Sequence, residues 1–213
     1  EKDQSYVLWG VSQDCLKRTI FPIGGMKKKD IRKIALDRGY NSLVNKSESY
    51  EICFIPDNDY RGFLKRRVKG LEQKVSDGNF ITKDGEIIGK HKGYPFYTIG
   101  QRKIGVSLGS QPSYVIDINP EQNTVIVGSK KDLLKRELYI RDVNYIKYTQ
   151  VEDGNEYLVK IRYKHSGEMA TLYNDSNNIR VVFHKKVEGI APGQSAVIYE
   201  GNDVIAGGFI MKT

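Results

Sequence analysis

The 213-residue chain has little of what marks a disulfide scaffold, a metal centre or a membrane protein. Its two cysteines, Cys15 and Cys53, lie far apart and outside any Cys-x-x-Cys or Cys/His spacing, so neither a disulfide framework nor a zinc site is predicted. The three histidines, His91, His165 and His184, are equally scattered. No apolar run approaches the ~20 residues that a membrane-spanning helix needs. With no secretory signal either, these absences favour a soluble cytoplasmic protein that has no membrane partner and binds no metal itself.

The chain also lacks an initiator methionine. It begins at Glu1 and runs straight into a patterned segment, so we expect it to be part of a longer protein. Its length allows one large or two small hydrophobic cores, because domains commonly hold about 100 to 150 residues.

Positive charge is concentrated in one part of the sequence. The net charge is +8 overall, yet residues 1–60 and 104–213 are nearly balanced at +1 and 0. Residues 61–103 carry 11 Lys and Arg against 4 Asp and Glu. A focused positive region attracts a polyanion by neutralising phosphates and releasing counterions. This favours a nucleic-acid partner, although a solvated lysine-rich surface has the same composition.

The pattern predicts a mainly β protein with a short helical N-terminal segment. The first sixty residues have helical spacing, and from Leu71 short runs alternate with turn signals. Five short strands are expected near the end, as is typical of a closed barrel or sandwich: 157–163, 169–173, 179–184, 195–199 and 204–211. We therefore predict a helical segment over 1–60, a small β-rich basic central domain over 61–130 and a C-terminal β-barrel over 131–213.

Two helices are expected in the N-terminal segment. A short helix follows Ser12, and a second one ends near Arg38 with Gly39 as its stop. Three apolar residues of the second helix have core spacing: Ile31, Ile34 and Ala35. Its start is ambiguous, because Lys27–Lys29 lie where the helix dipole disfavours cations. Either the helix begins at Asp30, a good N-cap, or these lysines serve an external anion.

Two other stretches have residue types that RNA-binding surfaces use. A strand over 157–163 would bury Tyr157, Val159, Ile161 and Tyr163 and expose three cations: Lys160, Arg162 and Lys164. An ordinary solvated strand face is the simpler interpretation of that alternation. Residues 89–103 interleave glycines, aromatics and cations, a mixture that can stack on unpaired bases and hold phosphates. His91 could be a ligand or a base, but a lone histidine more often serves only in local hydrogen bonds.

Cys53 stands in the short apolar run Ile52–Phe54, which by itself predicts a buried, unreactive thiol. Six short elements, in order along nearly the whole chain, nevertheless resemble the tRNA-specific 2-thiouridylase family. They are Lys2-Asp3-Gln4-Ser5-Tyr6, Phe21-Pro22-Ile23-Gly24, Ile52-Cys53-Phe54, Tyr97–Lys103, Lys160-Ile161-Arg162-Tyr163 and Ala191–Tyr199. Tyr50 departs from the glutamine that the family usually has before its cysteine.

The resemblance implies site residues. Cys53 matches the catalytic cysteine that receives persulfide sulfur, and six residues match positions that meet tRNA: Lys2, Asp3, Gln4, Arg162, Tyr163 and Gln194. Cys15 does not match the family's other catalytic cysteine, so we interpret it as structural.

The resemblance also implies the chemistry of the full-length enzyme, which thiolates C2 of the wobble uridine. ATP and magnesium activate the C2 oxygen in an N-terminal ATP pyrophosphatase domain, which has no counterpart in this sequence. A cysteine desulfurase or sulfur-relay protein loads Cys53, whose persulfide sulfur attacks C2 and displaces AMP. The family's other cysteine then forms a disulfide with Cys53.

We therefore interpret the chain as the C-terminal part of a tRNA-uridine 2-sulfurtransferase. We expect it to supply tRNA binding and the persulfide cysteine, to bind no cofactor itself and to be inactive alone. The alternative is a non-catalytic RNA-binding β module. Persulfide formation on Cys53 separates the two hypotheses.

Overall fold

The computed structural model describes residues 4–44, 54–55, 57 and 59–212. It forms two compact units. One consists of Glu1–Gln13 together with Gly70–Thr213, and the other of Asp14–Lys69. The first thirteen residues therefore belong with the β-rich part of the chain, although 56 residues separate the two stretches in sequence.

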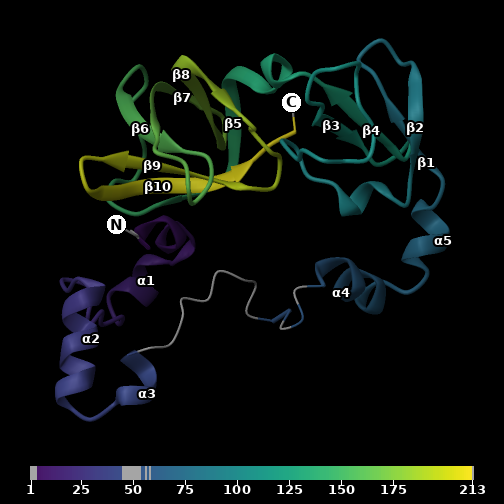
Figure 1. Ribbon diagram of the computed structural model, residues 1–213. Coiled ribbons are helices and arrows are strands. Elements are labelled where there is room, and N and C mark those ends of the chain that lie inside the picture. The colour runs from purple at the N-terminus through teal and green to yellow at the C-terminus, as the bar shows by residue number, and fades with distance from the viewer. Residues whose placement is uncertain (1–3, 45–53, 56, 58, 213) are drawn as a thin grey trace. The chain divides into compact units, whose positions relative to one another are not determined.

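Six antiparallel strands close a C-terminal barrel in the order β10-β5-β8-β7-β6-β9 (Figure 1). They are β5 (Leu134–Tyr145), β6 (Glu156–Lys160), β7 (Glu168–Asp175), β8 (Asn178–Glu188), β9 (Ser195–Glu200) and β10 (Asp203–Ile210). Alternating apolar residues fill the interior, among them Val159, Leu172, Val181 and Phe183, all fully buried. The predicted barrel and its last five strands are confirmed. The long strand β5 was not predicted.

A second, smaller sheet precedes the barrel. Its strands are β1 (Gly78–Ile81), β2 (Ile87–His91), β3 (Tyr114–Asn119) and β4 (Thr124–Gly128), in the order β2-β1-β4-β3. The pair β1 and β4 is parallel, whereas the other neighbours are antiparallel. Two single-turn helices follow the strands β2 and β4, η2 (Tyr94–Phe96) and η3 (Lys130–Leu133). The domain boundaries at residues 60 and 130 stay predictions.

The aromatic stretch 89–103 is not an exposed stacking surface. Phe96 is buried, and Tyr94 and Tyr97 pack against the core of the smaller sheet around Phe80. His91 is 5% exposed and its ring lies edge-on to Phe80, with centroids 5.1 Å apart. The aromatic rings of this stretch therefore contribute to packing, and an RNA contact there stays a prediction.

The helices lie before the sheets: α1 (Gln13–Leu16), α2 (Lys28–Asp37), α3 (Asn41–Val44), α4 (Tyr60–Arg67) and α5 (Leu71–Val75). Helix α2 begins at Lys28 with Lys27 as its N-cap, so the expected start at Asp30 is wrong. It ends as predicted, with Gly39 at φ +81°. The helices α4 and α5 were not predicted, because their charged sequences carry no clear apolar stripe. None of the described helices has the length and apolar character to cross a membrane.

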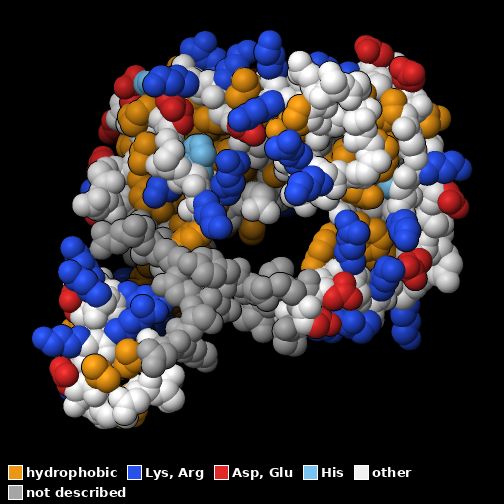
Figure 2. All heavy atoms as spheres, in the orientation of Figure 1, with side chains coloured by type: hydrophobic (Ala, Val, Ile, Leu, Met, Phe, Trp, Pro, Cys, Tyr) orange, Lys and Arg blue, Asp and Glu red, His pale blue; other side chains and the backbone are white. Residues whose placement is uncertain are grey.

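Helix α2 does not form a core within its own unit. None of its residues is buried, and Ile34 and Leu36 are 41% and 53% exposed. Figure 2 shows hydrophobic side chains at the surface of this part of the chain. Of the predicted core-facing stripe, Ile31 and Ala35 are half-buried and Ile34 is exposed, so none of the three reaches a core position among the described residues.

A 3-10 helix, η1 (Ser5–Gly10), packs on the outer face of the barrel. Tyr6 and Trp9, 8% and 9% exposed, form a small core with residues of β9: Val197 and Tyr199. The amide nitrogen of Asn144 donates to the carbonyl oxygens of Trp9 and Val11 at 2.5 and 3.0 Å. The N-terminal segment is thus attached to the barrel by apolar packing and by hydrogen bonds from the Asn144 side chain to its backbone carbonyls.

Candidate nucleic-acid interface

The loop after β6 places Arg162 and Tyr163 at one end of the barrel. The strand ends at Lys160, and the next residue, Ile161, is still buried in the barrel. Tyr163 is 38% exposed, so the expectation that it is buried is wrong. Beyond the end of β6 the alternation of buried and exposed residues no longer applies, because the chain turns away from the barrel wall.

Arg162 is anchored by the backbone at the end of strand β8. Its Nη1 donates to the carbonyl oxygen of Glu188 at 3.0 Å, while the residue as a whole is exposed. A guanidinium carries five donors in a rigid fork, so one can hold the side chain in place while others meet an external oxyanion. The carbonyl oxygen of Arg162 also accepts from the backbone N–H of His165 at 3.0 Å, which closes the turn.

Gln194 lies in the turn that leads into β9. Its backbone N–H donates to the carbonyl of Ala191 at 3.2 Å, and its carbonyl accepts from Ile210 N–H at 2.8 Å. The backbone is thus fixed on both sides while the residue is exposed. This combination suits a side chain whose amide reads a ligand.

Tyr6 connects these elements. Its hydroxyl donates to the carbonyl oxygen of Ser195, the residue after Gln194, at 2.7 Å. Its ring lies edge-on to that of Tyr163, with centroids 6.2 Å apart. Gln4, exposed, is the N-cap residue of η1, two positions before Tyr6. The structure therefore brings the Gln4, Tyr163 and Gln194 segments together around one tyrosine, across about 190 residues of sequence.

Three predicted site residues lie outside the described part of the chain: Lys2, Asp3 and Cys53. Tyr6 and Trp9 are the residues that sequence reasoning missed as parts of this site. Tyr6 belongs to the matched element Lys2–Tyr6, but no local pattern indicates that this element packs on a strand so distant in sequence.

Burial controls the protonation of two groups at this end of the barrel. It raises the pKa of Tyr6 to about 12, with a smaller effect from Tyr199, so the hydroxyl remains a donor at neutral pH. Burial, followed by the nearby Arg162 cation, lowers the pKa of His165. His165 is therefore neutral at neutral pH and adds no second positive charge near Arg162.

Two further groups of cations lie apart from Arg162. Lys160 Nζ is 4.7 Å from the centroid of the Tyr199 ring, a cation–π contact on the barrel wall. In α4, Asp59 caps the N-terminus by accepting from Gly62 N–H, and the last turn carries Lys65, Arg66 and Arg67. Residues 61–69 contain five cations and no acid, so most of the central charge excess belongs to this helix and its end. Figure 2 shows Lys and Arg side chains crowded over α4.

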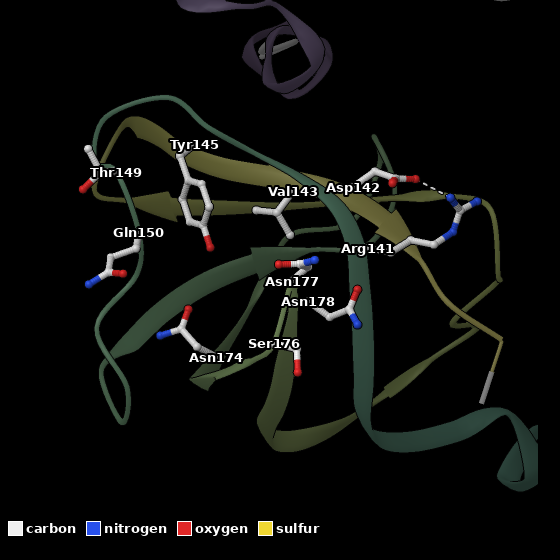
Figure 3. Close-up of a pocket in the computed structure, with 10 residues that line it drawn as sticks. All are labelled: Arg141, Asp142, Val143, Tyr145, Thr149, Gln150, Asn174, Ser176, Asn177 and Asn178. Carbon is white, nitrogen blue, oxygen red and sulfur yellow. Dashed lines mark hydrogen bonds and ion pairs between the residues drawn. The ribbon is translucent and has the colours of Figure 1, made fainter.

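A polar pocket opens at the other end of the barrel, beside the hairpin between β7 and β8 (Figure 3). Its volume is about 520 Å³, and it is lined by amides, hydroxyls and an ion pair between Arg141 and Asp142. The Tyr145 hydroxyl points into it. No predicted site residue lines it. The pocket is therefore separate from the surface around Tyr6.

Among the described residues, no group of three or more His, Cys, Asp or Glu side chains could hold a metal ion. Cys15 is exposed on α1, and no residue of this helix is buried. Its interpretation as a structural residue stays a prediction.

Comparison with known proteins shows the family of the chain. Three family models match successive parts of it: the tRNA methyl transferase HUP domain over residues 1–57, the tRNA methyl transferase PRC-barrel domain over 61–129, and the aminomethyltransferase β-barrel domain over 135–210. The tRNA-specific 2-thiouridylase MnmA of Cytophaga hutchinsonii is 52% identical over the whole chain. The chain belongs to the tRNA-specific 2-thiouridylase family.

Other members of the family are similarly close. The tRNA-specific 2-thiouridylases MnmA of Amoebophilus asiaticus and Salinibacter ruber are 52% and 46% identical, each over 98% of the chain. The chain spans 58%, 56% and 55% of the lengths of these three relatives. The resemblance inferred from six short elements is confirmed.

Proposed function

We propose that the chain is the tRNA-binding and sulfur-carrying part of a cytoplasmic tRNA-specific 2-thiouridylase. In this proposal Lys2, Asp3, Gln4, Arg162, Tyr163 and Gln194 contact tRNA, and Cys53 carries the persulfide. The full-length enzyme is a sulfurtransferase that thiolates C2 of the wobble uridine. The isolated chain binds tRNA and thiolates nothing.

The observation that carries the proposal is the meeting of distant segments around Tyr6. The hydrogen bond from Tyr6 to Ser195 and the ring contact with Tyr163 bring exposed side chains from η1, the β6 loop and the β9 turn to one end of the barrel. An arginine with spare donors, an exposed tyrosine and two amides are the groups that RNA recognition uses for phosphates, base faces and base edges.

The names of the matched models and of the relatives point to different chemistries. Two models are described as tRNA methyl transferase domains, whereas the relatives are named 2-thiouridylases. The relatives match the chain along its whole length at 46% to 52% identity, and each model matches one part of it. The chain also has a cysteine where sulfur transfer needs one. Both considerations favour thiolation.

ATP and magnesium belong to the part of the relatives that this chain does not span. The described residues include no group suited to a magnesium ion, so we assign no step through either cofactor here. The HUP-domain match over residues 1–57 is consistent with nucleotide chemistry in the full-length protein.

Cys53 has the role of sulfur carrier in this proposal. A persulfide presents a terminal sulfur that is a good nucleophile at neutral pH, and it attacks C2 once the oxygen there has been activated. The thiol of a second cysteine then attacks Cys53 Sγ. This breaks the persulfide S–S bond, forms a disulfide between the two cysteines and leaves the transferred sulfur on C2. A thiol reductant must reduce that disulfide before the next cycle, and a cysteine desulfurase or sulfur-relay protein is the partner that then reloads Cys53.

Changing Cys53 to Ser in the full-length enzyme tests the chemistry. The variant should make no 2-thiouridine yet retain ATP-dependent adenylation of the tRNA, because a hydroxyl cannot carry the persulfide that displaces AMP. Mass spectrometry of nucleosides, with ATP and a sulfur donor supplied, measures the product. Cys15→Ser is the matched control and should leave thiolation unchanged. Thiouridine made by the Cys53→Ser enzyme would remove Cys53 from the mechanism and leave a non-catalytic RNA-binding module as the better description of this chain.

A further inference from the structure

Tyr6 packs with Val197 and Tyr199 of β9, and two further contacts of its side chain lead to residues of the proposed tRNA surface. The hydroxyl contact reaches Ser195, next to Gln194, and the ring contact reaches Tyr163. The rest of η1 is held by other residues, because Trp9 packs on β10 and Asn144 binds the carbonyls of Trp9 and Val11. The Ser5 hydroxyl adds a hydrogen bond to the Tyr199 hydroxyl at 3.3 Å. Tyr6 and Ser5 therefore hold the beginning of η1, with the larger contact made by Tyr6, and Trp9 and Asn144 hold its end.

The position of Gln4 depends on that of Tyr6. It is the N-cap residue of η1, and its carbonyl oxygen accepts from Val7 N–H at 3.3 Å. A short 3-10 turn has few hydrogen bonds of its own, so tertiary contacts must hold it. If the Tyr6 contacts were lost, the first turn of η1 would lose its apolar packing on the barrel, and the Ser5–Tyr199 hydrogen bond alone would hold Gln4 less firmly in place.

We propose that Tyr6 is a positioning residue for tRNA binding. It holds Gln4 at the same end of the barrel as Tyr163 and Gln194, so that one RNA molecule meets residues from three distant segments at once. The proposal rests on the proposed function, because it takes these residues as tRNA contacts. The effect is pre-organisation: the conformational entropy of the Gln4 segment is lost during folding and not during RNA binding.

A purely structural role for Tyr6 makes a different prediction. In that case the loss of Tyr6 lowers stability but leaves the effect of a Gln4 substitution unchanged in chains that remain folded. If Tyr6 positions Gln4, the Gln4 side chain stops contributing to binding once Tyr6 is removed. The two roles are therefore separated by the coupling between positions 4 and 6.

The experiment measures binding of the 213-residue chain to an unmodified tRNA transcript with uridine at the first anticodon position. Gln4→Ala is made in the parent, in Tyr6→Phe and in Tyr6→Ala. We expect Gln4→Ala to weaken binding about 3- to 10-fold in the parent, as for loss of one hydrogen bond. The factor should fall below about 2 in Tyr6→Ala and be intermediate in Tyr6→Phe, which keeps the ring. Arg162→Ala should have the same effect in all three, because Glu188 anchors Arg162.

Trp9 gives an independent readout of docking, because it is the chain's single tryptophan and is 9% exposed. Tyr6→Ala should shift its emission to longer wavelength as η1 loosens, with an unchanged far-ultraviolet circular dichroism spectrum. Tyr145→Phe, the same chemical change as Tyr6→Phe at the other end of the barrel, should change neither emission nor binding.

Each outcome decides the question. An undiminished Gln4→Ala effect in folded Tyr6→Ala or Tyr6→Phe chains overturns the positioning role. A Gln4→Ala chain that binds like the parent, while Arg162→Ala binds weakly, overturns it too. If the parent chain does not bind the transcript at all, the proposed function fails, and the Trp9 emission still reports whether Tyr6 docks η1. Should Tyr6→Ala unfold, the Tyr6→Phe chain decides.

Discussion

Trp9 packs edge-on against Phe209, with ring centroids 5.1 Å apart and an interplanar angle of 86°, directly over Gly207. A Cβ atom at Gly207 would lie 2.7 Å from Cβ and Cγ of Trp9. These atoms are close to the backbone of η1, so they cannot move aside by a rotamer change alone. The absence of a side chain at position 207 is therefore what lets η1 lie flat on β10.

Gly207→Ala should displace Trp9 and weaken the docking of η1. We expect a loss of about 1 to 3 kcal/mol in the free energy of unfolding, the range for overpacking a tight contact. Urea titrations followed by Trp9 emission and by circular dichroism measure it. Gly10→Ala is the control, because a Cβ at Gly10 meets nothing within 4 Å. Equal stability of the Gly207→Ala chain and the parent would contradict the close approach.

Asp132 should make the stability of the chain depend on pH in the acid range. Its carboxylate accepts from Lys83 Nζ at 2.7 Å and from Ser129 N–H and Oγ–H. These bonds, with Lys83 first, lower the pKa of Asp132 from 3.8 to about 2. Because the folded-state pKa is the lower one, the contribution is complete above about pH 4 and is lost as the pH falls through about 2.

Asp132→Asn should therefore be less stable than the parent at neutral pH and equal to it near pH 2. We expect a difference of about 1 kcal/mol, since the lysine side of the pair is largely in solvent. Denaturation curves at several pH values measure the gap. Asp84→Asn, the same change in the turn beside Lys83, should give a curve close to that of the parent. A gap that persists unchanged at pH 2 would show that Asp132 acts by shape and not by charge.

The cations at the end of α4 should account for part of the salt dependence of tRNA binding. Replacing Lys65, Arg66 and Arg67 by Gln should reduce the slope of log affinity against log salt concentration by about 2, because each neutralised phosphate adds somewhat less than one. Filter binding over a range of salt concentrations measures the slope.

The matched control changes Lys27, Lys28 and Lys29 to Gln, which removes the same charge from the first turn of α2. An unchanged slope in the α4 variant combined with a reduced slope in this control would place the phosphate contacts on α2. That outcome would support the idea that these three lysines serve an external anion.

Local pattern predicted the barrel well, because strands such as β6 alternate buried and more exposed residues, and because β9 and β10 are short apolar runs between turn signals. The inward positions of β6 illustrate this, since Val159 and Ile161 are buried as expected. Tyr163 broke the pattern because the strand ends three residues earlier. Alternation gives the face of a residue only while the chain remains in the sheet.

The candidate site was predictable residue by residue but not as an assembly. Gln4, Arg162, Tyr163 and Gln194 came from short matches, and each is exposed as a contact residue must be. Their meeting depends on one hydrogen bond and one ring contact made by Tyr6, between segments about 190 residues apart. Hydrophobic periodicity reports which residues are buried and does not report which distant segments bury them together.

Arg162→Ala should weaken tRNA binding by the chain by about 1 to 3 kcal/mol, the range for a charged hydrogen bond at an interface. The barrel should remain folded, because the exposed Arg162 side chain lies outside the core and bonds only to the carbonyl oxygen of Glu188, at the end of β8, among the contacts that the structure describes. Arg162→Lys should recover part of the affinity, since a lysine keeps the charge but not the planar fork. Lys185→Ala removes one exposed cation from β8 and is the control for charge alone. If Arg162→Ala and Lys185→Ala lower the affinity equally, Arg162 contributes only to the general positive field, and the loop after β6 is not a specific contact.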